Sequence, residues 1–301
     1  MCAVSIRVVN PHRLPPSVMA HSLDGLFANW YISYVLHEHS ALSCIYGREV
    51  AVENALRVAQ RAWKLSPADT RPAFDVFTLA TFTRTRNTNE SRCGLPENCT
   101  ALLSHPLVEY FDAPLYSVDG LGQYIVDARV PTGYRAVPSV LFAPYGGSNP
   151  HRCAATQDRI SPIPLWFFER DLQGACLGVP VDRACRGDMQ LLRGEYEIGF
   201  FEKKTTLKIK FDWPNYAPSE KQIRGTKKSP MHTVARLAKL TAGAVRNFMV
   251  DPQRTMIDTA NPQPWNIGTA NGEVSVQDVL LLGVIFVSDG AAMPLLAARI
   301  Q

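Results

Sequence analysis

Charged residues are scarce in this 301-residue chain, and long apolar runs are absent. Only 19% of the residues are Asp, Glu, Lys or Arg, whereas 46% are hydrophobic. That balance excludes an intrinsically disordered chain, which combines low hydrophobicity with high net charge. The longest apolar run, Val279–Val287, has nine residues, whereas a membrane span needs about 18. The sequence therefore predicts a folded protein with no membrane partner.

The N-terminus lacks the basic flank and apolar stretch of a secretory signal. The cysteines also lack a C-x-x-C pair, and they are scattered over positions 2, 44, 93, 99, 153, 176 and 185. Seven scattered cysteines are typical of free thiols in a reducing compartment, and they do not support a structural zinc site. We therefore expect an intracellular protein, cytoplasmic or nuclear, with no disulfide framework.

Recognisable catalytic and nucleotide-binding motifs are missing as well. There is no G-x-S-x-G elbow, and the run Gly225–Lys228 lacks the upstream glycine of a P-loop. His37-Glu38-His39 with Cys44 is the densest group of potential metal ligands. Because residues two apart on a helix point about 200° apart, the two histidines would not chelate together there. Glu169 and Asp171 follow an apolar strand and are interpreted as solvated acids. We assign no catalytic residue, no metal site and no cofactor.

Helical spacing dominates the first third of the chain. A helix is predicted from a Ser22 cap to about His37. A second helix is predicted over 48–65, where Ser66-Pro67 ends the pattern. The segment 74–82 fits helical and strand spacing equally well. The first helix has apolar residues at Leu23, Leu26, Phe27, Trp30, Tyr31 and Tyr34.

The middle of the chain has short strands and loops. Nine prolines between 106 and 180 argue against long helices there. We predict an exposed loop over 83–99, strands over 123–130 and 137–143, and a linker over 146–162, which is rich in Gly, Ser, Asn and Pro.

Clearer patterns follow the linker. The run 163–168 (IPLWFF) predicts a strand, and 181–192 predicts a short helix. Residues 207–213 alternate apolar and polar, so one face of a strand should be buried there. A further helix is predicted from a Ser229-Pro230 start to about Met249.

The last apolar segments are harder to assign. Residues 279–287 are apolar all round, which fits a buried helix or a central strand. A capping-box pattern at Ser275 and Asp278 favours the helix. We expect 294–300 to form an edge strand because it begins with Pro294.

Together these elements predict an α+β fold. We expect a helix-rich N-terminal region over 1–145, the linker over 146–162, and a C-terminal α/β region over 163–301 in which helices pack on a small mixed sheet.

The C-terminal half resembles a group of uncharacterised proteins from basidiomycete fungi. The similar features extend from IPLWFF to about Ser288 and include Trp213-Pro214-Asn215-Tyr216 and a helix beginning Ser229-Pro230. In that group a glycine usually occupies the position of Asn215. The resemblance covers about 140 residues of the chain and implies that the protein is fungal. It implies no activity.

Basic residues are concentrated near the C-terminus. Residues 1–202 carry 18 basic and 20 acidic side chains, whereas 203–301 carry 13 and 7. Such an excess raises the hypothesis that the segment 221–254 binds nucleic acid through phosphate contacts. The candidate residues are Lys221, Arg224, Lys227, Lys228, Arg236, Lys239 and Arg246.

Three function classes remain open from the sequence. The leading interpretation is a non-catalytic intracellular binding or protein-interaction protein, and the sequence does not identify its partner. Nucleic-acid binding through 221–254 is the first alternative, and an enzyme with dispersed catalytic residues is the second. An exposed apolar patch would favour the protein partner, a continuous positive surface the nucleic acid, and a pocket with a perturbed titratable group the enzyme.

Overall fold

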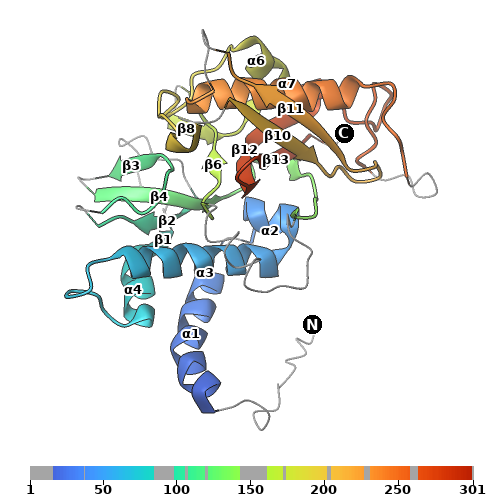
Figure 1. The fold of residues 1–301 in the computed structure, drawn as a ribbon. Coiled ribbons are helices and arrows are strands. Elements are labelled where there is room, and N and C mark those ends of the chain that lie inside the picture. The colour runs from blue at the N-terminus through green and yellow to red at the C-terminus, as the bar shows by residue number, and fades with distance from the viewer. Residues whose placement is uncertain are drawn as a thin grey trace.

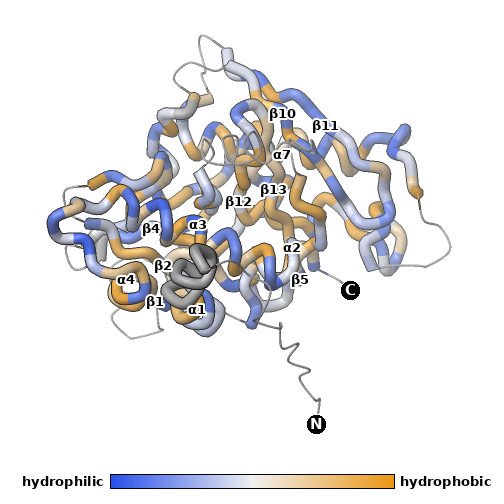
Figure 2. Tube along the Cα trace, turned by 60° about the horizontal axis from the view of Figure 1, so that its bottom comes forward, coloured by the Kyte–Doolittle hydropathy of each residue, from blue (hydrophilic) through white to orange (hydrophobic). Residues whose placement is uncertain are grey.

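Two apolar strands form the centre of the largest sheet (Figure 1). β12 (Val279–Ser288) and β13 (Ala291–Ala298) pair antiparallel, and nearly every side chain in them is buried. A strand that is covered on both faces needs apolar residues at successive positions. In Figure 2 the two strands lie at the hydrophobic centre of the molecule. The fold is described from a computed structural model for residues 16–36, 38–84, 98–105, 108–118, 121–142, 161–171, 174–201, 205–226, 231–257 and 264–299.

The central sheet is mixed and has seven strands. Its order is β11-β10-β13-β12-β6, and two short strands add to it, β5 on β13 and β9 on β12. β10 runs parallel to β13, whereas the other pairings are antiparallel. The remaining bounds are β5 (Arg135–Ala136), β6 (Leu165–Trp166), β9 (Val179–Pro180), β10 (Thr206–Phe211) and β11 (Ser219–Arg224).

Helices cover this sheet. α6 (Val181–Arg186) and α7 (Val234–Val250) lie above it in Figure 1, and α2 (Ala41–Tyr46) lies below. The buried face of α7 packs on the strands, where Phe248 stacks on Phe211 of β10 with ring centroids 4.9 Å apart. Cover on both sides explains why β12 and β13 are apolar throughout.

The N-terminal half combines helices with a second sheet. This sheet is antiparallel, with the order β1-β2-β4-β3, and α3 and α4 lie beside it in Figure 1. A separate hairpin joins β7 to β8. The bounds are α1 (Pro16–Val35), α3 (Arg48–Leu65), α4 (Phe74–Thr81), β1 (Phe82–Arg84), β2 (Cys99–Leu103), β3 (Leu115–Val118), β4 (Leu121–Ala128), β7 (Phe168–Asp171) and β8 (Gly174–Leu177).

The two halves share one hydrophobic core. β5 belongs to the N-terminal half by sequence but pairs with β13 near the C-terminus. The Trp166 indole N–H donates to the Ile125 carbonyl at 3.2 Å, and the Asn54 amide donates to the Pro162 carbonyl at 2.8 Å. Helices and mixed sheets together make this an α+β fold, as predicted, although the N-terminal half also contains a sheet of its own. Most of the predicted linker lies outside the described residues.

Several predicted elements agree with the structure. The helix over 48–65 has the predicted bounds, and the strands over 123–130 and 207–213 correspond to β4 and β10. The ambiguous segment 74–82 is α4 followed directly by β1. The predicted loop over 83–99 begins in β1 and ends in β2, and 85–97 lies outside the described residues.

The helix prediction for 279–287 is wrong. The capping box at Ser275 and Asp278 is present, but it closes only one 3-10 turn, η4 (Val276–Asp278). β12 then begins at Val279. Local capping does not decide the conformation beyond the first turn, whereas pairing with β13, β6 and β9 does.

The edge-strand prediction for 294–300 is also wrong, because β13 lies inside the sheet. Pro294 is tolerated there because β10 pairs with residues 291–292 and β5 with 297–298, so no strand faces the proline nitrogen. The predicted strand over 137–143 is likewise wrong, since only β5, just before it, is a strand.

Three predicted helices have different bounds in the structure. α1 begins at Pro16 rather than Ser22, and α6 ends at Arg186, where Gly187 takes a left-handed conformation with φ of 82°. α7 begins at Val234, and the Thr233 hydroxyl accepts from the Arg236 N–H as its cap.

Asn215 has a backbone conformation that explains its type. Its φ of 72° lies in the left-handed region, which glycine favours and asparagine tolerates better than other residues. The Asn215 side-chain amide also donates to Asn266 Oδ1 at 3.1 Å. Asparagine therefore meets a backbone requirement that most residues with a side chain do not.

Candidate functional site

The clearest surface feature is a row of exposed aromatic side chains on α1. Trp30 is 61% exposed, Tyr34 73% and Phe27 42%, and Leu26 beside them is 62% exposed. The rings contact one another, with centroid distances of 5.8 Å for Trp30–Tyr34 and 5.7 Å for Phe27–Trp30. Large apolar side chains rarely gather on a solvent-facing helix surface without a binding role.

α1 is anchored through its opposite side. Ala28 and Ile32 are fully buried, and the Tyr31 hydroxyl donates to the Phe82 carbonyl at 3.1 Å. Arg48 of α3 donates to the Ser33 carbonyl at 2.8 Å. The Ala28 N–H donates to Asp75 Oδ1 of α4 at 3.1 Å. These contacts fix the direction in which the aromatic row faces.

α4 packs on α1 and has two exposed apolar side chains of its own. Val76 is 56% exposed and Leu79 is 51% exposed. We call the six side chains together the α1–α4 surface: Leu26, Phe27, Trp30, Tyr34, Val76 and Leu79.

An open groove runs between α1 and α3 beside this surface. It has a volume of about 420 Å³, and its lining includes acids, a base and apolar side chains. Asn29 and Ser33 precede Trp30 and Tyr34 by one residue each, so the groove lies about 100° around α1 from the aromatic row. The lining residues are Asn29, Ser33, Arg48, Glu49, Val52, Glu53 and Leu56.

The predicted basic residues on β11 lie on opposite faces of the sheet. Lys221 pairs with Ile209 and therefore lies on the face that α7 covers, whereas Arg224 pairs with Thr206 on the other face. Glu220 on that second face forms ion pairs with Lys208 at 2.6 Å and Lys210 at 3.0 Å. Strand geometry thus separates two residues that the sequence hypothesis placed on one surface.

The basic residues of α7 have mixed environments. Lys239 donates to the Arg186 carbonyl at the end of α6, at 3.2 Å. Arg236 is half-buried and Arg246 is exposed. Lys227 and Lys228 lie outside the described residues. Among the candidate residues that the structure describes, Lys221 and Arg224 are therefore the two that do not share a face.

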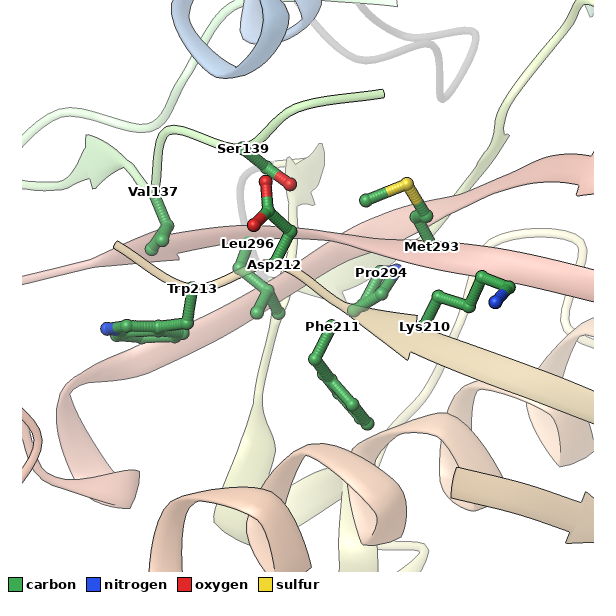
Figure 3. A pocket seen from close by; sticks show the side chains of 9 residues that line it. All are labelled: Val137, Ser139, Lys210, Phe211, Asp212, Trp213, Met293, Pro294 and Leu296. Atoms are coloured by element: carbon green, nitrogen blue, oxygen red, sulfur yellow. The ribbon is translucent and has the colours of Figure 1, made fainter. Parts of the chain in front are cut away.

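A small pocket lies beside Pro294, on the edge of β13 that faces away from β12, between the pairings with β10 and β5. Figure 3 shows the Ser139 hydroxyl and the Asp212 carboxylate facing each other across it. The Val140 N–H donates to Asp212 at 2.5 Å, and the Lys210 ammonium lies 3.9 Å from the centre of the Phe142 ring. The pocket volume of about 20 Å³ is enough for a water molecule. That size does not suit an organic substrate.

Asp127 and Ser40 form a buried acid–hydroxyl pair. The Ser40 hydroxyl donates to Asp127, which also accepts from the N–H groups of Leu42 and Ala128 at 3.3 and 2.8 Å. Burial raises the pKa of the Asp127 carboxyl to about 6, although these hydrogen bonds oppose the shift. Ser40 in turn caps α2 by accepting from the Ser43 N–H at 3.0 Å. The pair therefore fixes the start of α2 against β4.

Other reactive side chains are committed to structure. Glu169 accepts two hydrogen bonds from Arg183 at 2.8 and 3.2 Å, so it is not the freely solvated acid predicted. Burial raises the pKa of the Cys44, Cys99 and Cys185 thiols, which is the opposite of what activates a nucleophile. None of Cys44, Cys99, Cys176 and Cys185 is in a disulfide.

Metal ligands do not converge in the described part of the chain. Within it, no group of three His, Cys, Asp or Glu side chains is placed to hold an ion. His37 lies outside the described residues. Trp213 and Tyr216 are both buried, and the Trp213 indole donates to the Trp265 carbonyl at 2.7 Å, so these two aromatic side chains belong to the core.

Comparison of the chain with protein-family models, curated proteins and solved structures finds no match. No described helix has the length and apolar character needed to cross a bilayer.

Sequence reasoning missed the α1–α4 surface. The residues that suggest a helix by their spacing, such as Leu26, Trp30 and Tyr34, are the exposed ones, and the buried ones are Ala28 and Ile32. A usable signal was present, because Gly25–Leu36 contains no charged residue. A surface helix normally has a charged face, so a helix without one has further apolar surface to cover.

Proposed function

We propose that this chain is a non-catalytic intracellular binding protein that binds a protein partner through the α1–α4 surface. The observation that carries the proposal is the exposed row of Leu26, Phe27, Trp30 and Tyr34 on an anchored helix. Tyr and Trp are enriched at protein interfaces and contribute most of the binding energy there.

The surroundings of the row fit the anatomy of an interface. Interfaces have an apolar centre and a polar rim. Here the groove beside the row provides that rim, with Arg48, Glu49 and Glu53. The patch is also formed by two packed helices, so it is presented without a large ordering cost.

The alternatives have less support in the described residues. Phosphate binding needs basic side chains that line one groove, whereas Lys221 and Arg224 point to opposite faces of β11. For catalysis, the acids with the strongest local contacts, Asp127 and Glu169, are engaged by Ser40 and Arg183.

Site-directed photocrosslinking tests the proposal. A photoreactive benzoyl-phenylalanine replaces Tyr34, and the same probe at Phe142, an exposed aromatic on another part of the surface, is the matched control. In cells that express the protein, irradiation should produce covalent protein adducts from position 34 and not from 142. Wild-type protein without the probe should compete for the partner and suppress the adducts. A probe-free Trp30→Ser, Tyr34→Ser double variant should not suppress them. Equal adducts at both positions, or none at 34, would contradict the proposal.

A further inference from the structure

We infer that the protein partner is a second copy of this chain, with the two α1 helices packed antiparallel across a two-fold axis at Trp30. This inference rests on the proposed function, because it assigns the occupant of the α1–α4 surface.

The charge of the surface favours an identical partner. Gly25–Leu36 carries no charged side chain, so two copies of this face meet without repulsion. The neighbouring groove presents both signs of charge, the base Arg48 and the acids Glu49 and Glu53, so the base of one copy can pair with an acid of the other. A nucleic acid would instead need a positive surface, and a helix lying on a membrane is usually rich in Lys and Arg on its polar face.

The spacing of the row suits two-fold pairing. Leu26, Trp30 and Tyr34 follow one another at intervals of four residues, so they form one ridge along α1. In an isologous contact each residue meets the counterpart related by the axis. With the axis at Trp30, the two indoles meet at the centre, and Leu26 of each copy lies opposite Tyr34 of the other.

The exposed area is close to what a stable dimer needs. The six side chains of the α1–α4 surface are between 42% and 73% exposed. With about 150–250 Å² for each aromatic side chain, they offer on the order of 600 Å² per copy. A standard interface buries about 800 Å² per partner. The polar groove beside α1 can supply the difference.

Sedimentation equilibrium of the purified full chain tests this inference. Between 1 and 100 µM, the wild type should shift from 33.4 kDa toward twice that mass. Trp30→Glu places two like charges at the axis and should weaken association by about 30-fold or more, as expected for a central tryptophan. Val250→Glu, an exposed apolar residue at the end of α7, is the matched control and should dimerise like the wild type.

A charge-pairing experiment tests the position of the axis. Trp30→Glu and Trp30→Lys should each be monomeric, and an equimolar mixture should form a heterodimer. Because Trp30 is largely exposed, both variants should keep the wild-type circular dichroism spectrum, which separates loss of pairing from loss of folding.

The outcomes distinguish this inference from the proposed function. A wild type that stays monomeric at 100 µM while the position-34 probe captures a different protein overturns the dimer and leaves the proposed function standing. A monomer whose probe captures nothing overturns both. A dimer that persists in Trp30→Glu, or a monomer that binds phosphatidylcholine vesicles through Trp30, also overturns the inference.

Discussion

At the scale of single residues, Asp127 is the most consequential buried polar group. It is 1% exposed, and it connects β4 to the start of α2 through Ser40 and Leu42. Because a buried carboxylate loses its hydration, the protonated form is favoured and the pKa rises to about 6. The hydrogen bonds from Ser40, Leu42 and Ala128 reduce this cost without removing it.

Asp127 should therefore make the protein less stable as the pH rises. Its pKa is higher in the folded chain than the ordinary value of 3.8. The protonated carboxyl therefore contributes fully to the free energy of unfolding below about pH 4, and this contribution is lost as the pH rises through about 6. The difference between the two pKa values corresponds to roughly 3 kcal/mol. Urea unfolding at pH 4 and pH 7.5 should show wild type losing stability relative to Asp127→Asn by an amount of that order. All other titrating groups are common to both proteins, and a pH-independent difference between them would contradict the assignment.

At the scale of elements, β10 shows how an alternating sequence is used. Leu207, Ile209 and Phe211 are buried beneath α7, whereas Lys208 on the opposite face is exposed and pairs with Glu220. The strand has partners on both edges, β11 and β13, so it cannot slip by one residue without exposing its apolar side chains.

Two adjacent substitutions in β10 should differ sharply in their effect. Ile209→Asp places an unpaired charge in the core and should lower the free energy of unfolding by about 3 kcal/mol or more. Lys208→Asp removes an exposed ion pair and places two acids side by side, so it should cost roughly 1 kcal/mol or less. Thermal denaturation of the two variants gives the ranking, and a larger loss for Lys208→Asp would mean that the register is wrong.

At the scale of the whole molecule, the two halves are joined by pairing and packing. β5 pairs with β13, and α2 contacts both strands, so the C-terminal sheet is completed by N-terminal residues. Trp166 and Asn54 add hydrogen bonds between the halves. The division of the chain into two regions by a linker over 146–162 stays a prediction. The contacts described above couple the stability of the two regions.

We expect the whole chain to unfold in one cooperative transition. Separating the halves would expose buried parts of β13 and break its pairing with β5, so neither half should unfold without the other. Denaturation followed by tryptophan fluorescence and by far-ultraviolet circular dichroism should give coincident curves. Two separated transitions would instead support independent N-terminal and C-terminal domains. Val137→Pro, which removes the N–H that donates to the Leu296 carbonyl of β13 at 2.9 Å, should shift the whole curve rather than split it.

Local patterns in the sequence determined the elements whose signals lie within a few residues. The helix over 48–65 has an apolar stripe and a Ser-Pro end, and the strand over 207–213 alternates, so each specifies its own period. The α+β class follows from such elements. The tertiary structure decided what depends on distant partners. Residues 279–287 became a strand because three other strands pair with them, and Pro294 entered the sheet because no strand faces its nitrogen.

The candidate site depended on tertiary structure even more strongly. Periodicity predicts that Leu26, Trp30 and Tyr34 share one side of a helix, but both sides of α1 are apolar, so the sequence does not say which side faces the core. Contacts with α3, α4 and β1 bury Ala28 and Ile32 and leave the aromatic row exposed. Similarly, composition shows that 221–254 is basic, but strand geometry directs Lys221 and Arg224 to opposite faces. Which surface a side chain joins is set by packing between distant segments, and local sequence does not contain that information.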